Sequence, residues 1–118
     1  MKYLCLIHSE REKLDVLPKD ELDAILNEYF AVTDEIKKSG HYLASAALQP
    51  ARTAVIVRMR NGKLSTTDRP FAETKEQLGG FFLIDARDLN EAIQVAATIP
   101  GARWGSVEVR PVLEPTPP

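Results

Sequence analysis

Hydrophobic and polar positions follow a period of two in several short segments of the chain, which predicts strands. Val55, Val57 and Met59 alternate with their neighbours, and the Asn61-Gly62 pair that follows predicts a tight hairpin turn. The predicted strands are 2–8, 53–60, 63–66, 81–85 and 104–110, and a short segment at 42–48 is compatible with an extended conformation.

Two other segments have the helical period of 3.6. The first, over 18–38, begins at Pro18 and stops at Gly40, residue types that favour those two positions. Its apolar stripe consists of Leu22, Ile25, Leu26, Tyr29, Val32, Thr33 and Ile36. The second helix, over 89–98, is opened by Asp88-Leu89-Asn90-Glu91, which has the form of a capping box.

The order of these elements is strand, helix, hairpin, loop, strand, helix and strand, which predicts an α+β fold. We expect a ferredoxin-like sandwich, an antiparallel sheet with two helices on one face. The other face would expose Leu and Phe side chains, and pairing with a second copy in a homodimer would bury them. One domain spans 1–112, and 113–118 form a Pro-rich tail.

Composition and charge narrow the class of protein. The net charge of −2 creates no general basic field, so we expect no nucleic-acid partner. A single cysteine, Cys5, excludes an intrachain disulfide and favours a cytoplasmic location. No apolar run approaches the roughly 20 residues of a membrane-spanning helix. His8 and His41 lack metal-ligand spacing and no cofactor motif is present, so neither metal nor cofactor is expected.

The last predicted strand carries a polar face. Ser106, Glu108 and Arg110 alternate with two valines, and Trp104 would continue the polar side. Because the valines should meet the helices, the polar residues should lie on the open face of the sheet. A carboxylate and a guanidinium there can bind an anion or serve acid–base chemistry. The alternative is a structural ion pair between Glu108 and Arg110 or across the dimer.

His8 ends the first strand on the same face as Leu4 and Leu6. If this strand lies beside the last one, His8 points near Glu108 or Arg110 and supplies a group that titrates near neutral pH. The alternative is a partly exposed histidine at a strand end. His41 is expected to be a surface residue.

The segment 67–82, Thr-Asp-Arg-Pro-Phe-Ala-Glu-Thr-Lys-Glu-Gln-Leu-Gly-Gly-Phe-Phe, resembles the signature of the DGPF branch of the YCII-related proteins. The opening 1–4, the helix around 90–92 and the segment 105–112 are similar as well. The resemblance implies a ferredoxin-like subunit that pairs into a dimeric α+β barrel. Relatives in the wider superfamily include a dehydrochlorinase and lactone isomerases, and some DGPF members occur beside, or fused to, alternative sigma factors.

Two departures from the family pattern limit what the resemblance implies about the site. Arg69 replaces the signature glycine, so this loop accommodates a long cation. Leu22 and Asp23 occupy the region where many YCII members carry a catalytic-type histidine. A His–Asp dyad therefore does not carry over to this chain.

The signature loop supplies the other candidate residues. Asp68 can cap the backbone amides that follow it, and Phe71 can anchor the loop. Arg69, Phe71, Glu73 and Lys75 could contact a substrate at the mouth of a pocket, which Glu76 could also line. The alternative is a rigid loop at a dimer interface.

Two functions from different classes follow. In the first, the protein is a cofactor-free acid–base enzyme that acts on a small anionic molecule. His8 or Glu108 moves a proton, and Arg110 holds the anion with Ser106 nearby. Asp68 orients the signature loop. In the second, a non-catalytic homodimer binds a ligand or a protein and has a regulatory role linked to transcription. The polar alternation of the last strand favours the first.

Overall fold

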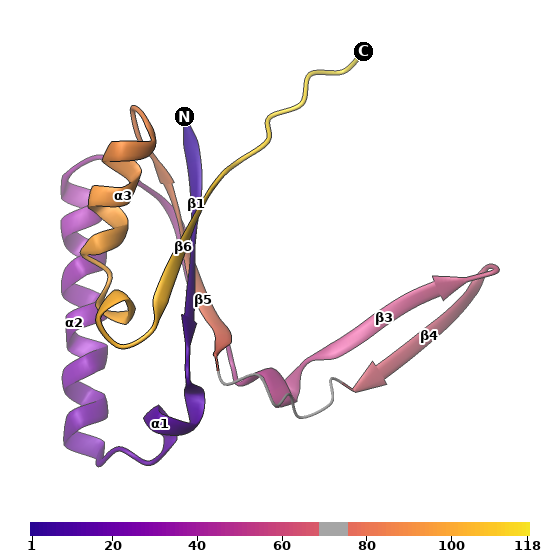
Figure 1. Cartoon of the computed structure of the whole chain (residues 1–118), viewed down its shortest axis with the longest axis horizontal. Coiled ribbons are helices and arrows are strands. Elements are labelled where there is room, and N and C mark those ends of the chain that lie inside the picture. Colours follow the sequence, from indigo (N-terminus) through magenta and orange to yellow (C-terminus); the bar gives the residue numbers. More distant parts are fainter. Residues whose placement is uncertain (69–75) are drawn as a thin grey trace.

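A computed structural model of the chain describes residues 1–68 and 76–118, and Figure 1 shows its arrangement. The helices and strands, in chain order, are β1 (Lys2–Ser9), α1 (Arg11–Asp15), α2 (Lys19–Lys38), β2 (Tyr42–Ala47), β3 (Val55–Arg60), β4 (Lys63–Asp68), β5 (Gln77–Asp85), α3 (Leu89–Ala97) and β6 (Ser106–Pro111). Two short 3₁₀ turns, η1 (Ala51–Thr53) and η2 (Pro100–Arg103), complete the described elements.

Four strands form an antiparallel sheet in the order β2-β5-β1-β6, and α2 and α3 both lie on one face of it. The architecture is compatible with the predicted ferredoxin-like α+β fold. The first strand is central, and its neighbours β5 and β6 come from the far end of the sequence. In the part of the chain that the structure describes, no helix is both long and apolar enough to span a bilayer.

The core lies between the helices and the sheet. Alternate residues of β1 point into it, so Tyr3, Cys5 and Ile7 are buried while Leu4 and Leu6 face the other side. Burial raises the pKa of the Cys5 thiol to about 11, which keeps it protonated and fits the sequence interpretation of an inert core residue.

Helix α2 departs from its predicted stripe. Val32 and Ile36 are buried, as expected from the helical period, but Leu22 and Leu26 in the N-terminal half are 38% and 53% exposed. Pro18 is the N-cap residue rather than the first helical residue, and the helix ends before Gly40, whose φ of 81° is the left-handed conformation that glycine favours.

The capping box predicted for α3 is confirmed. The side chain of Asp88 accepts a hydrogen bond from the backbone N–H of Glu91 at 2.9 Å. Glu91 Oε1 in turn accepts from the backbone N–H of Arg87 at 3.1 Å. The first bond satisfies a backbone donor in the first turn of α3, and the second satisfies the N–H of Arg87, one residue before the N-cap Asp88.

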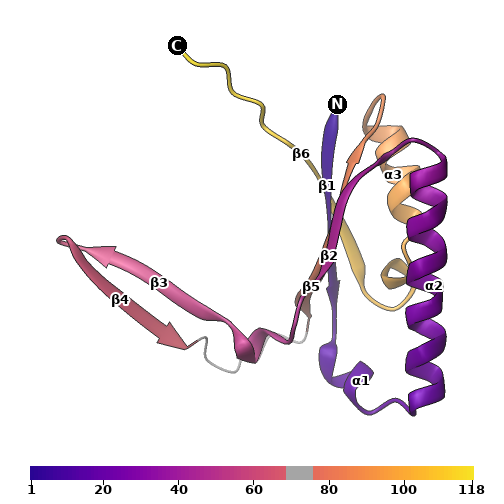
Figure 2. The same ribbon diagram turned by 180° about the vertical axis from the view of Figure 1, so that it is seen from behind.

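The hairpin prediction is confirmed, but the hairpin does not join the main sheet. Asn61 and Gly62 have φ values of 52° and 72°, the positive values that a two-residue hairpin turn requires. Strands β3 and β4 pair only with each other as a two-stranded sheet, and the main sheet takes its outer strand from 42–47 instead. Figures 1 and 2 show the hairpin as an arm that leaves the body on the side away from the helices.

The arm, residues 55–68, has two unlike faces. Val57 pairs with Thr66 and Met59 with Leu64, which places these side chains together with Val55 on one face. Val55, Val57, Met59 and Leu64 are 57%, 61%, 57% and 67% exposed, so no part of the monomer within 1–68 and 76–118 covers this apolar face. An isolated two-stranded hairpin is marginally stable in water, so the arm needs a further surface to hold its shape.

Candidate functional site

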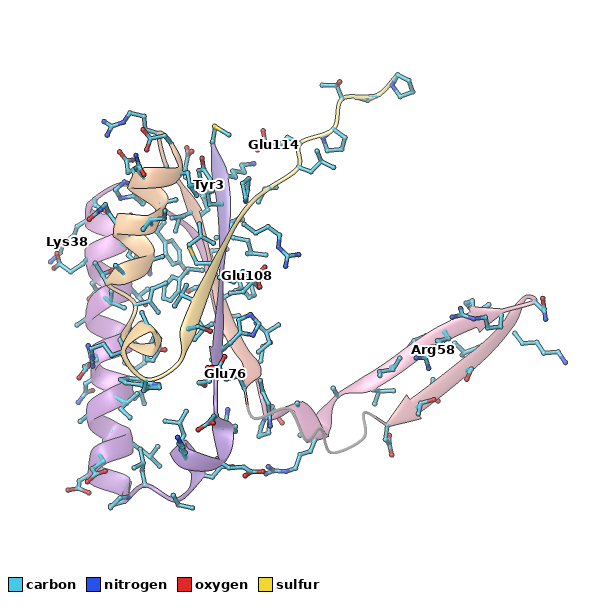
Figure 3. The ribbon with its side chains drawn as sticks, viewed as in Figure 1. Tyr3, Lys38, Arg58, Glu76, Glu108 and Glu114 are labelled. Atoms are coloured by element: carbon cyan, nitrogen blue, oxygen red, sulfur yellow. The ribbon has the colours of Figure 1, made fainter. Side chains whose placement is uncertain are left out.

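The open face of the sheet carries a polar cluster where β1 and β6 pair. Residues opposite each other in an antiparallel pair share a face of the sheet. Val107 and Val109 pack against the core, so the residues between them point to the open side. The pairs that result are Leu4 with Arg110, Leu6 with Glu108, and His8 with Ser106. Figure 3 shows Glu108 on the side of the sheet that lies away from the helices.

The structure brings His8, Glu108 and Arg110 into one hydrogen-bonded chain. His8 Nε2 lies 3.3 Å from Glu108 Oε1, and Arg110 Nε donates to Glu108 Oε2 at 2.8 Å. Arg110 Nη2 also donates to Glu108 Oε2. The side chains of His8 and Glu108 are 30% and 37% exposed, so solvent and small molecules can reach both.

The neighbours of Glu108 hold it in its charged form. The hydrogen bond from Arg110 is the largest cause that lowers the pKa of Glu108, desolvation opposes it, and the bond from His8 lowers the pKa further. An ionised Glu108 can stabilise an imidazolium on His8 but is a weak base itself. Among the described residues, His8 Nδ1 has no hydrogen-bond partner.

We expect Arg110→Met to raise the pKa of Glu108 towards that of an ordinary glutamate, because the largest favourable contact of the carboxylate is lost. A carbonyl carbon-13 NMR titration of the Glu108 side chain measures this pKa directly. His8→Gln should raise it less, since the bond from His8 contributes less than the bond from Arg110. An unchanged pKa in Arg110→Met would show that the pair does not persist in solution.

The hydroxyl of Ser106 already has a hydrogen-bond partner. Its Oγ donates to Glu76 Oε2 at 3.2 Å, so a second carboxylate lies at the lower edge of the cluster, where Figure 3 labels Glu76. Ser106, which pairs with His8 across the strands, therefore holds Glu76 rather than presenting a free hydroxyl.

The remaining predicted residues do not join this cluster. Asp68 ends β4, where it pairs with Val55 in the arm, and no described contact connects it to His8. Arg69, Phe71, Glu73 and Lys75 lie outside the described residues.

The expected position of Trp104 is wrong. Strand β6 begins at Ser106, so the alternation does not extend back to residue 104. The turn η2 redirects the chain there, and Trp104 lines a cavity on the helix-covered side of the sheet.

Sequence reasoning missed a second histidine cluster. His41 Nδ1 lies 2.7 Å from Ser39 Oγ, and His41 Nε2 lies 2.9 Å from Glu91 Oε1. The chain of contacts ties the end of α2 to the start of α3. The sequence feature that could have indicated this cluster is Glu91 in the capping box, because that position directs its carboxylate towards the start of the helix. Across residues 1–68 and 76–118, no three His, Cys, Asp or Glu side chains gather as a metal ion requires.

Comparison with known proteins identifies the class to which this fold and site belong. The profile of the YCII-related domain matches residues 1–116, and the chain belongs to the YCII-related family. It is 35% identical over 114 residues to an uncharacterised protein of Rhizobium meliloti (strain 1021), a match that covers 95% of this chain and 92% of that protein.

Proposed function

We propose that the protein is a homodimeric, cofactor-free acid–base enzyme of the DGPF branch that acts on a small anionic molecule at the His8–Glu108–Arg110 chain. The observation that carries the proposal is the contact of His8 with a carboxylate that Arg110 keeps charged. The similarity of the signature segment that ends at Phe82 supports the branch.

Each residue has a role that its contacts support. His8 accepts a proton from the substrate at Nδ1, since Nε2 faces Glu108. Glu108 orients the ring and stabilises the imidazolium, as carboxylates do in other histidine-based sites. Arg110 holds Glu108 through Nε and Nη2, which leaves Nη1 to bind an anionic group of the substrate. Proton transfer of this kind serves eliminations and isomerisations.

The homodimer would close this site. Leu4, Leu6, Phe81 and Leu83 share the open face with the cluster and are only half-buried in the monomer. A second copy against this face would remove them from water and enclose His8 and Glu108 in a cavity. The arm leaves the body on this same side, where it can reach the second copy (Figure 2).

A thermal-shift screen against small organic acids, lactones and chlorinated phenols tests the binding part. A ligand at a hundred times its dissociation constant should stabilise the protein by about 2.7 kcal/mol, a rise in melting temperature of roughly ten degrees. Any hit is then assayed for turnover. We expect His8→Gln and Glu108→Gln to lower kcat about 100-fold or more.

The matched control is His41→Gln, which changes the other histidine outside the site and should keep full turnover. Full activity in both site variants would remove this assignment.

The second candidate is a non-catalytic homodimer that binds a ligand or a protein and regulates transcription. The association of relatives with sigma factors is the reason for considering this role. The exposed apolar face of the arm favours it, since such a face suits contact with another protein. Ligand binding without turnover of any ligand, together with recovery of one reproducible protein partner, would support this role over the enzyme.

A further inference from the structure

A cavity of about 380 Å³ lies between α2 and the helix-covered face of the sheet, on the opposite side of β1 from the His8 cluster. Adjacent residues of a strand face opposite sides, so Ile7 and Ser9 line this cavity while His8 does not. Ile25, Phe82 and Trp104 contribute to its largely apolar wall. Binding pockets for small molecules commonly have volumes of about 300–1,000 Å³.

Ser9 is the first sign that the cavity takes a ligand. The residue is only 8% exposed, yet its hydroxyl makes no hydrogen bond to any residue within 1–68 or 76–118. No fully buried side-chain nitrogen or oxygen in these residues lacks a partner, so the Oγ of Ser9 is open to the cavity and can take a hydrogen-bond partner there. A group that enters the cavity can supply that partner.

Tyr29 gives the cavity a second polar atom. Its Oη accepts a hydrogen bond from the backbone N–H of Gly101 at 3.1 Å, and its own O–H has no acceptor among the described residues. Burial is the largest cause that raises the pKa of Tyr29, so the phenol stays protonated and can donate. The Oη lies near Ile7: a Cβ placed on Gly101 would be 2.8 Å from both.

The described residues of the lining include no unpaired charge. Arg11 is the single charged residue among them, and Arg11 donates to Asp15 at 3.2 Å and to the carbonyl of Leu48 at 3.4 Å. An ionised ligand would lose its hydration here without gaining a counter-charge. The cavity therefore suits an uncharged molecule, whereas the cluster on the open face suits an anion.

We propose that this cavity binds an uncharged, mainly apolar molecule of one or two rings, whose hydroxyl or carbonyl group bonds to Ser9 Oγ and Tyr29 Oη. The site is distinct from the acid–base site, because the sheet separates the two.

The test uses 4-methylphenol and toluene, two probes of similar shape that differ by one hydroxyl group. Amide NMR shifts on titration of the intact protein locate and quantify binding. We expect 4-methylphenol to bind with a dissociation constant of about 1 mM or lower and to shift the amides of Ser9, Gly79 and Gly101. Ser9→Ala and Tyr29→Phe should each weaken the binding of 4-methylphenol about fivefold and leave the binding of toluene unchanged.

Two controls separate this site from other effects. Tyr3→Phe removes a phenol hydroxyl that lies on the same face of the sheet but outside the cavity lining, and it should change the affinity for neither probe. His8→Gln should also change neither, which keeps the result independent of the acid–base proposal. The inference would be overturned if no amide around the cavity shifted, or if the two cavity variants lost affinity for both probes equally.

Discussion

Val57→Asp is expected to weaken the proposed homodimer about 100-fold or more, because the carboxylate falls on the apolar face of the arm and occurs twice in a symmetric dimer. The arm, residues 55–68, carries three basic residues and one acidic residue and has a net charge of +2, so the rest of the chain has a net charge of −4. Opposite charges on arm and body favour the approach of the arm to a second copy. Sedimentation velocity over a range of concentrations gives the dissociation constant.

Ser65→Asp is the matched control. It adds the same charge to the same hairpin, but Ser65 pairs with Arg58 on the opposite face (Figure 3 labels Arg58). Its dimer should keep a dissociation constant within about threefold of the original. A wild-type protein that remains a monomer at high concentration, or two variants with equal effects, would exclude the arm as a dimer contact.

Gly105→Ala should lower the free energy of unfolding by about 3 kcal/mol, which in a domain of this size lowers the melting temperature by roughly ten degrees. A Cβ at this position would lie less than 3.0 Å from the carbonyl oxygen of His8, and that oxygen belongs to the central strand and cannot move freely. The shift needed to relieve the contact would also displace His8 from Glu108. Thermal unfolding followed by circular dichroism measures the loss.

Gly79→Ala provides the comparison within the same sheet. A Cβ there would meet its nearest neighbours, Ile7 O and Ser9 Oγ, at 3.9 Å, an ordinary contact. The stability of this variant should stay within about 1 kcal/mol of the original. Equal losses in the two alanine variants would mean that the close approach at Gly105 is not the cause.

The parts of the fold that depend on local signals could be predicted from the sequence. The hairpin turn needs only the positive φ values that Asn61 and Gly62 adopt readily, and the α3 capping box needs only residues three apart. Strand β2 was harder to predict because its sequence, YLASAA, is rich in small residues with low strand preference. It forms because its backbone pairs with β5, a long-range contact that local patterns do not record.

The site could be predicted in part for the same reason. Period-two alternation and the neighbouring positions of the first and last strands bring His8 to Glu108. The hydrogen bond from Arg110 to Glu108 depends on the conformations of the two side chains, which the period-two alternation of the sequence does not determine. The cavity beside Ser9 also escaped prediction, since elements far apart in the sequence enclose it.

The central place of β1 has a consequence for synthesis of the chain. Strand β1 is made first, but its two partners, β5 and β6, end at Asp85 and Pro111. During translation, one edge of β1 therefore stays unpaired until β5 has been made, and the other stays unpaired until β6, near the end of the domain, has been made. Open apolar edges can associate with other chains, so completion of the C-terminal strand protects this strand from aggregation.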